Sequence, residues 1–197
     1  MIKYIYLILA ISFFSFVKGD FINRKISSHV SIDIPKELLL VPLSAETKFA
    51  QQVAPMAMYE SADQEAKLVV KLITEVIDTN AKSIYKNPSS NQIPSKDINL
   101  ERLFKKSSLS SQFDAITFYQ DTIKIIDGNR FIVYEYSATA SGIDEKGLKT
   151  TSKTYSYYQI CYVKNKTYIF NFYCPEDRKE EWKTNASLMM NSIKIKK

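Results

Sequence analysis

Four long segments in the second half of the chain alternate apolar or aromatic residues with polar ones. They are ITFYQDTIKII, RFIVYEYSATA, TYSYYQICYV and TYIFNFYC, and they lie between residues 116 and 174. This alternation is typical of β-strands, in which successive side chains point to opposite faces. Asp127-Gly128, between the first two segments, indicates a tight hairpin because glycine tolerates the positive φ of such turns. We therefore predict an antiparallel sheet, from which the longer loop SGIDEKGLKTTSK projects.

The first half of the chain carries shorter signals. His29–Pro35 alternates with a period of two and ends in proline, which predicts a half-buried strand. Ser44 can cap a short helix over residues 45–53, and Met56–Val76 is typical of a hairpin around the turn-forming ADQE. Residues 78–97 are mostly polar and contain two prolines, so we expect a surface connection and the best candidate for mobility.

Two segments have the periodicity of amphipathic helices. Asp97 can cap INLERLFKK, in which Leu100, Leu103 and Phe104 form an apolar stripe. Near the end of the chain, Pro175 suits the first position of a helix, and the acidic residues after it complement the helix dipole. The apolar face of this last helix consists of Trp182, Ala186, Met189, Met190 and Ile193. The charged run CPEDRKEEW is thus interpreted as the joint between a strand and a helix.

The chain opens with MIKYIYLILAISFFSFVKGD, which has the pattern of a secretory signal peptide. Lys3 supplies the positive end, and the apolar run after it is shorter than the ~20 residues of a membrane-spanning helix. Small residues at Val17 and Gly19 predict cleavage before Asp20, so that residues 1–19 form the signal peptide. We expect an exported protein, periplasmic or secreted, without a stable membrane anchor after cleavage. An uncleaved anchor is the alternative.

Removal of the signal leaves 178 residues, a length that suits one domain with a hydrophobic core. We assign residues 20–28 to a flexible N-terminal segment and residues 29–197 to that domain. The formal charge is +6, but lysines alternate with acidic residues instead of gathering among aromatic ones as in nucleic-acid-binding proteins. No nucleic-acid partner is therefore expected. Frequent lysine, isoleucine and asparagine with sparse glycine indicate an AT-rich bacterial genome.

Three stretches of the second half resemble the PsbP-like family, named for an extrinsic protein of photosystem II. They are KIIDGNRFIVYEYSATASG, YSYYQICYVKNKTYIFNFYC and WKTNASLMMNSIKI. The same fold occurs in a Ran-binding nuclear import factor and in exported bacterial proteins. The resemblance covers residues 116–195 and, more loosely, residues 29–77. It implies an α+β fold, an antiparallel β-sheet flanked by helices on both faces (an α/β/α sandwich), and an accessory or binding role without shared catalytic residues.

Patterns for catalysis and metal binding are sparse. His29 is the only histidine, and neither it nor the two cysteines have the spacing of a zinc site or of a nucleophile–histidine pair. A phosphate-binding GxxxxGK[ST] loop is also missing. Paired carboxylates, as in some hydrolases, stay open as an alternative. We expect no metal, no cofactor and no enzymatic activity.

Both cysteines fall in the last predicted hairpin. If this hairpin turns on Asn165-Lys166, Cys161 lies opposite Phe170 and Cys174 lies opposite Tyr157, four ladder positions apart on one face. At ~3.3 Å per residue the separation is ~13 Å, which is too long for a disulfide. We therefore expect two buried, unbridged thiols. A reactive Cys174 at the start of the last helix is the alternative.

The chain has thirteen tyrosines, and many of them lie in the predicted strands FIVYEYSATA and YSYYQICYV, where they fall on both faces. Tyr158, Tyr162 and Tyr173 share one face of the last hairpin, and we single them out as a candidate binding surface for a protein or a sugar. Cross-strand aromatic pairs beneath a helix are the structural alternative. The sequence thus predicts an exported α+β protein that binds a protein partner. A carrier of a small apolar or sugar ligand and a carboxylate-based hydrolase are the other candidates.

Overall fold

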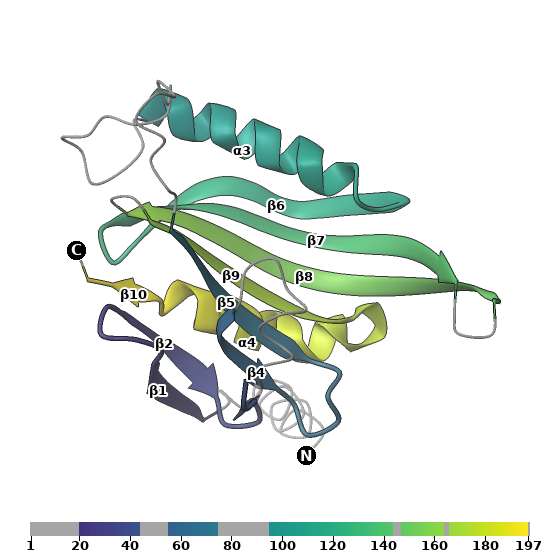
Figure 1. Cartoon of the computed structure of the whole chain (residues 1–197), viewed down its shortest axis with the longest axis horizontal. Coiled ribbons are helices and arrows are strands. Elements are labelled where there is room, and N and C mark those ends of the chain that lie inside the picture. Colours follow the sequence, from purple (N-terminus) through teal and green to yellow (C-terminus); the bar gives the residue numbers. More distant parts are fainter. Residues whose placement is uncertain (1–19, 44–54, 75–94, 144–146, 164–165, 197) are drawn as a thin grey trace, which may run out of the picture.

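The described part of the chain forms a main sheet of seven antiparallel strands (Figure 1). The computed structural model describes residues 20–43, 55–74, 95–143, 147–163 and 166–196. The strand order is β3 (Leu39–Leu40), β4 (Pro55–Glu60), β5 (Lys67–Thr74), β9 (Lys166–Pro175), β8 (Lys149–Val163), β7 (Asn129–Ile143) and β6 (Ala115–Ile126). The predicted α+β class with an antiparallel sheet is confirmed. The expected signal peptide, the helix over residues 45–53 and most of the 78–97 connection lie outside the described residues.

A second sheet brings together the two ends of the described chain. Its strands β1 (Phe21–Lys25), β2 (Val30–Pro35) and β10 (Lys194–Ile195) have the order β1-β2-β10 and are antiparallel. Strand β2 confirms the strand predicted over residues 29–35. Strand β1 corrects the expectation that residues 20–28 form a flexible segment: it pairs along the length of β2, whose backbone groups need hydrogen-bond partners on that side.

The β7–β8 hairpin is longer than the sequence predicts. Its strands stay paired as far as Ile143 and Lys149, so that both flanks of the expected 141–153 loop are strand. Two threonines near the start of β8 favour this extended backbone. In Figure 1 the hairpin runs out beyond the neighbouring strands. The turn between β6 and β7 agrees with the prediction, because Asp127 and Gly128 have φ values of 49° and 72°.

Helix α4 (Lys179–Asn191) packs on the main sheet and lies below it in Figure 1. It belongs to the larger hydrophobic cluster, together with β2 and alternate residues of β5, β8 and β9. The predicted apolar face is confirmed, because its five residues are all buried. One 3₁₀ turn, η1 (Glu176–Arg178), connects Pro175 at the end of β9 to the helix. CPEDRKEEW is therefore a joint between a strand and a helix, as predicted.

Helix α3 (Ser95–Ser110) forms where a helix was predicted, but its apolar stripe does not face the sheet. Ile98 is 3% exposed and joins a smaller hydrophobic cluster with residues of β7 and β8. By contrast, Leu100, Leu103 and Phe104 are 46%, 54% and 56% exposed. An apolar stripe at this spacing normally packs against a core. In this helix the stripe lies on the outer side.

Polar contacts fix α3 in this orientation. Arg102 and Lys106 both form salt bridges with Asp121 of β6, the second at 2.8 Å. Glu101 accepts a hydrogen bond of 2.7 Å from the hydroxyl of Tyr162 on β8. These partly buried charges need their partners on the sheet, because an unpaired charge is costly to bury. Their side of the helix therefore faces the sheet, and the apolar stripe faces away from it.

The register of the β8–β9 hairpin differs from the prediction by two residues. Cys161 pairs with Tyr168 instead of Phe170, and Cys174 pairs with Tyr155 instead of Tyr157. A shift of two leaves every side chain on its predicted face, because side chains alternate with a period of two. The two cysteines share that face six ladder positions apart, about 20 Å at 3.3 Å per residue. Both are buried and are not joined in a disulfide, as expected.

Candidate functional site

A cavity of ≈ 330 Å³ opens on the main sheet, on the face that carries the smaller hydrophobic cluster. Six side chains from three adjacent strands line it, and we call it the sheet cavity. They are Val69 and Lys71 of β5, Ile169, Asn171 and Tyr173 of β9, and Tyr158 of β8.

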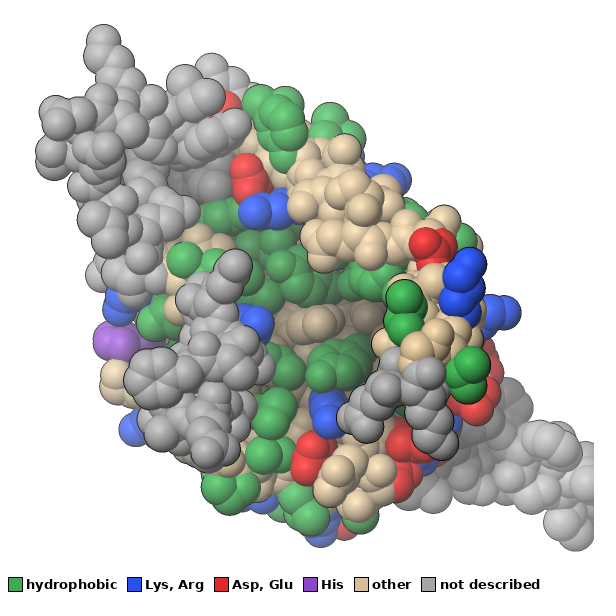
Figure 2. All heavy atoms as spheres, turned by 45° about the vertical axis from the view of Figure 1, so that its right-hand side comes forward, with side chains coloured by type: hydrophobic (Ala, Val, Ile, Leu, Met, Phe, Trp, Pro, Cys, Tyr) green, Lys and Arg blue, Asp and Glu red, His purple; other side chains and the backbone are tan. Residues whose placement is uncertain are grey.

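Strand pairing brings these side chains together. Val69 and Tyr158 pair with Asn171 from its two sides, and Lys71 pairs with Ile169. Along β9 the alternate residues enter the larger hydrophobic cluster on the opposite face, so that the sequence TYIFNFYC divides between core and cavity. Figure 2 shows the surface hollowed in the middle of the view, with hydrophobic side chains across the hollow and charged side chains around it.

Two of the three tyrosines singled out from the sequence line this cavity. Tyr158 and Tyr173 do so from neighbouring strands, whereas Tyr162 is not part of the lining and instead donates its hydroxyl hydrogen bond to Glu101 of α3. The sequence reasoning missed Lys71 and Asn171. A signal for Asn171 was present, because it is the one side-chain amide in the otherwise mainly apolar and aromatic strand β9.

The polar atoms of the cavity have few partners within the described chain. The Oδ1 atom of Asn171 is buried and accepts no hydrogen bond, and Lys71 forms no salt bridge with a described residue. The ring of Tyr158 stacks on that of Tyr134, with centroids 6.3 Å apart. Burial, followed by the neighbouring Tyr136, raises the pKa of Tyr158 to about 12. Tyr158 therefore stays a neutral phenol that can donate a hydrogen bond.

The lining of the sheet cavity carries side chains suited to recognition. Two apolar side chains, two tyrosine rings, one amide and one ammonium group make it up, and none of the six residues is an acid, a histidine or a cysteine. Elsewhere in the described ranges no three His, Cys, Asp or Glu side chains gather as metal ligands do. Burial raises the pKa of Cys174 to about 12, which argues against the alternative of a reactive thiolate there.

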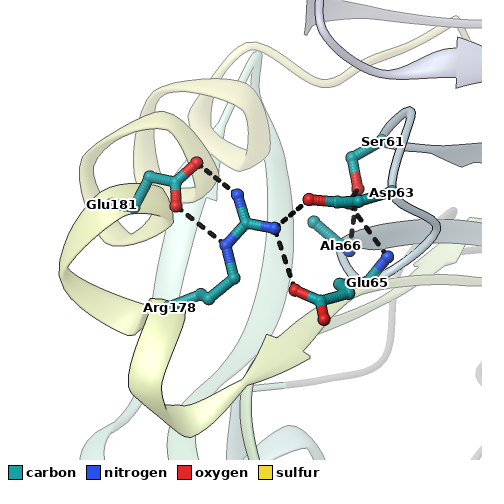
Figure 3. Close-up of polar contacts among 6 residues, drawn as sticks. All are labelled: Ser61, Asp63, Glu65, Ala66, Arg178 and Glu181. Carbon is teal, nitrogen blue, oxygen red and sulfur yellow. Dashed lines mark hydrogen bonds and ion pairs between the residues drawn. The ribbon is translucent and has the colours of Figure 1, made fainter.

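The charges of the joint form a clamp around Arg178 (Figure 3). Its guanidinium donates to both carboxylate oxygens of Glu181 in α4, at 2.8 and 2.6 Å. On its other side it pairs with Asp63 and with Glu65, the latter at 3.0 Å, both in the turn between β4 and β5. Arg178 thus ties the start of α4 to that turn. This arrangement connects structural elements, and each of the acids drawn in Figure 3 pairs with Arg178.

Asp63 makes this clamp sensitive to acid. Hydrogen bonds from Ser61, the Glu65 backbone N–H and Arg178 lower its pKa from 3.8 to about 2. A carboxylate with a lowered pKa stabilises the fold above its ordinary pKa, and that stabilisation is lost as the pH falls toward the lowered value. We expect the urea midpoint of Asp63→Asn to lie below that of the parent from pH 5 to 7. The difference should shrink below about pH 4 and be mostly lost near pH 2.

Asp177→Asn serves as the control, because Asp177 is exposed, precedes Arg178 in the chain and is not among the three acids that pair with Arg178. Its midpoint should follow that of the parent at every pH. A deficit of Asp63→Asn that is the same at pH 2.5 and pH 6 would contradict the assigned role of the ionised carboxylate.

Comparisons with known proteins give matches in structure but not in sequence. No family model and no curated protein matches the chain. Cyanobacterial PsbP (CyanoP) from Synechocystis sp. PCC 6803 is similar with a TM-score of 0.55 and 11% identity, over 92% of this chain and 96% of that chain. LpqN of Mycobacterium tuberculosis, which is involved in cell envelope biogenesis, is similar with a TM-score of 0.51 and 9% identity, over 90% and 91% of the chains.

The Ran-binding protein Mog1p of Saccharomyces cerevisiae is also similar, with a TM-score of 0.45 and 8% identity over 90% of this chain and 96% of that chain. Identities of this size carry information on the fold alone. The likeness to CyanoP and LpqN extends over nearly the whole length of each chain. The chain has the PsbP-like fold that its second half resembles.

Proposed function

We propose that the mature chain is a non-enzymatic binding domain, an α/β/α sandwich that acts on a protein partner through the outer face of α3. The observation that carries this proposal is the exposed apolar stripe of Leu100, Leu103 and Phe104. Large apolar side chains that cluster on a surface are typical of interaction sites, and helices are often recognised through residues at this spacing.

Two features of α3 suit it to recognition. Its sheet-facing side is held by Ile98 and by the salt bridges to Asp121, so the outer face is presented by a fixed helix. A fixed surface loses little conformational freedom on binding, which favours affinity. Lys105, one residue beyond Phe104, has a side chain that is 45% exposed, but it pairs with Glu101 of the same helix at 3.6 Å. The stripe itself is therefore what this face offers, and the complementary partner has an apolar groove.

A binding role also suits the lining of the sheet cavity, which combines apolar and aromatic side chains with one amide and one ammonium group. We further propose that the protein works outside the cytoplasm, in the periplasm or as a secreted protein. The signal-like N-terminus supports this location, and so does the fold shared with LpqN, which is involved in cell envelope biogenesis. No helix in the described part of the chain has both the length and the hydropathy to cross a membrane.

Photocrosslinking in the source organism tests the proposed surface. A photoreactive amino acid at position 103 should give one discrete crosslinked species, and the same amino acid at Ile125 should give none. Ile125 is the matched control because it is exposed and apolar but lies on β6. The crosslinked protein is then identified by mass spectrometry and purified.

Binding of that purified partner is measured with the variant Leu103→Asp/Phe104→Ser. We expect the affinity to fall about 10-fold or more, because residues at the centre of an interface commonly contribute over 1 kcal/mol each. Ile125→Ser should bind like the parent, and all three proteins should unfold at similar denaturant concentrations because the changed side chains are exposed. No discrete species at position 103, or unchanged affinity of the double variant, would reject the proposed surface.

A further inference from the structure

The sheet cavity is a site of its own, built on strands β5, β8 and β9 and independent of the proposed helix surface. Its volume of ≈ 330 Å³ lies at the small end of the roughly 300–1,000 Å³ range of ligand pockets. The occupant that such a volume fits is a small compound with one ring, because a long acyl chain or a folded segment needs more room. Its walls combine the apolar side chains Val69 and Ile169 with the rings of Tyr158 and Tyr173.

Lys71 gives the cavity a charge preference. Four residues earlier, on the same face of β5, Lys67 forms a salt bridge of 3.6 Å with Glu60 of β4. Lys71 lies beside Pro55 in that pairing, and no described acid reaches it. A partly buried lysine without a described carboxylate partner favours an anionic ligand, because the attraction between charges is stronger away from bulk water.

Asn171 adds a hydrogen-bond preference. Its Oδ1 is a buried acceptor that receives no hydrogen bond, a condition that costs free energy in a folded protein. Asn171 lies at the centre of the cavity, between Val69 on one neighbouring strand and Tyr158 on the other. Rotation of the amide would turn this oxygen into the cavity, where a ligand hydroxyl or N–H would satisfy it. The neutral phenol of Tyr158 can donate a hydrogen bond to the same ligand.

We propose that the sheet cavity binds a small cyclic carboxylic acid that carries a hydroxyl or amino group. The carboxylate pairs with Lys71, the ring lies against Ile169 and the tyrosine rings, and the hydroxyl or amino group donates to Asn171. A neutral sugar would use the same aromatic wall but would gain nothing from the charge of Lys71. Lys71 therefore distinguishes the two ligand classes.

A ligand panel tests this assignment on the purified mature chain. The probes are hydroxybenzoic and aminobenzoic acids, the primary amides of the same acids, and neutral monosaccharides, each measured by ligand-observed NMR and calorimetry. At least one acid should bind at millimolar concentration or better, and its amide should bind about 10-fold more weakly. Binding by no acid of the panel, or equal binding of acid and amide, overturns the proposal. Preference for a monosaccharide identifies a sugar site and overturns it as well.

Two lysine variants locate the interaction. Lys71→Met keeps the aliphatic stem and removes the charge, so it should weaken binding of the acid about 10-fold or more. Lys67→Met, on the same face of β5 and outside the lining, should change the affinity less than twofold. Equal effects of the two variants would mean that only the general charge of this surface matters, which contradicts the assigned site.

The double variant Leu103→Asp/Phe104→Ser should bind the acid like the parent, because those residues lie outside the lining. Loss of acid binding in this variant contradicts a separate cavity site. Rejection of the helix surface and rejection of the ligand site can therefore be told apart, because different variants test them.

Discussion

Truncation of Trp182 to alanine should lower the free energy of unfolding by ~3–5 kcal/mol, the range for removal of a large aromatic side chain from a core. Trp182 is 4% exposed, and its ring packs on that of Phe172 in β9, with centroids 5.6 Å apart. The contact joins the first turn of α4 to the main sheet. A domain of this size is held together by ~5–15 kcal/mol, so the loss is a large share of the total. Urea or guanidinium unfolding measures it.

Two further variants separate packing from polarity. Trp182→Phe keeps a ring in contact with Phe172 and removes an indole N–H that is buried without a partner, so it should lose less than half as much stability as the alanine variant. Glu180→Gln, on the exposed side of the same helix, should change stability by less than ~0.5 kcal/mol. If Trp182→Ala unfolds like the parent while Glu180→Gln loses a binding activity, the joint is a functional site.

Local periodicity predicted the elements that pack through alternate or helical faces. The central strands and the last helix each follow one period. Alternate residues of β7 and β8 enter the two different hydrophobic clusters, and α4 buries Trp182, Ala186 and Met189. The predicted face of each β8 side chain is correct, even though the predicted register is wrong by two residues. A shift by an even number changes the cross-strand partner but leaves the face unchanged.

Helix α3 shows where periodicity fails. Its stripe of Leu100, Leu103 and Phe104 was as regular as that of α4, yet the helix packs through Ile98 and charged residues. The partner that decides this is Asp121, on a strand that begins only after the helix has ended. A single-helix pattern contains no information about a charge on another element. The stripe is therefore visible in the sequence, but its exposure is not.

Only the aromatic part of the sheet cavity could be predicted from the sequence. Tyr158 and Tyr173 lie on the same hairpin, so the period of two placed them on one face before any pairing was known. Lys71 belongs to β5, which pairs with β9 across nearly a hundred residues of chain. No turn or local pattern encodes that pairing. The position of Lys71 in the cavity is therefore known only from the three-dimensional structure.

Replacement of Gln159 by methionine should raise the free energy of unfolding by ~1–3 kcal/mol, the desolvation cost of a buried polar group that lacks a partner. Gln159 is fully buried in β8, between Val133 of β7 and Phe170 of β9, and neither its Oε1 nor its Nε2 forms a hydrogen bond. Methionine has nearly the same length and shape without the polar atoms, so the surrounding packing is kept. The measurement is the urea midpoint at constant slope.

Gln159→Glu is the control variant, which keeps the size of the side chain but should lower stability instead of raising it. It places a carboxyl group in the same apolar surroundings, where burial raises its pKa and the ionised form is unfavourable. Because its pKa is higher in the folded than in the unfolded state, the variant should lose stability as the pH rises from about 4 to about 8. Gln159→Met should show no such dependence relative to the parent. If the methionine variant unfolds more easily than the parent at every pH, the amide of Gln159 is hydrogen-bonded in solution and stabilises the core.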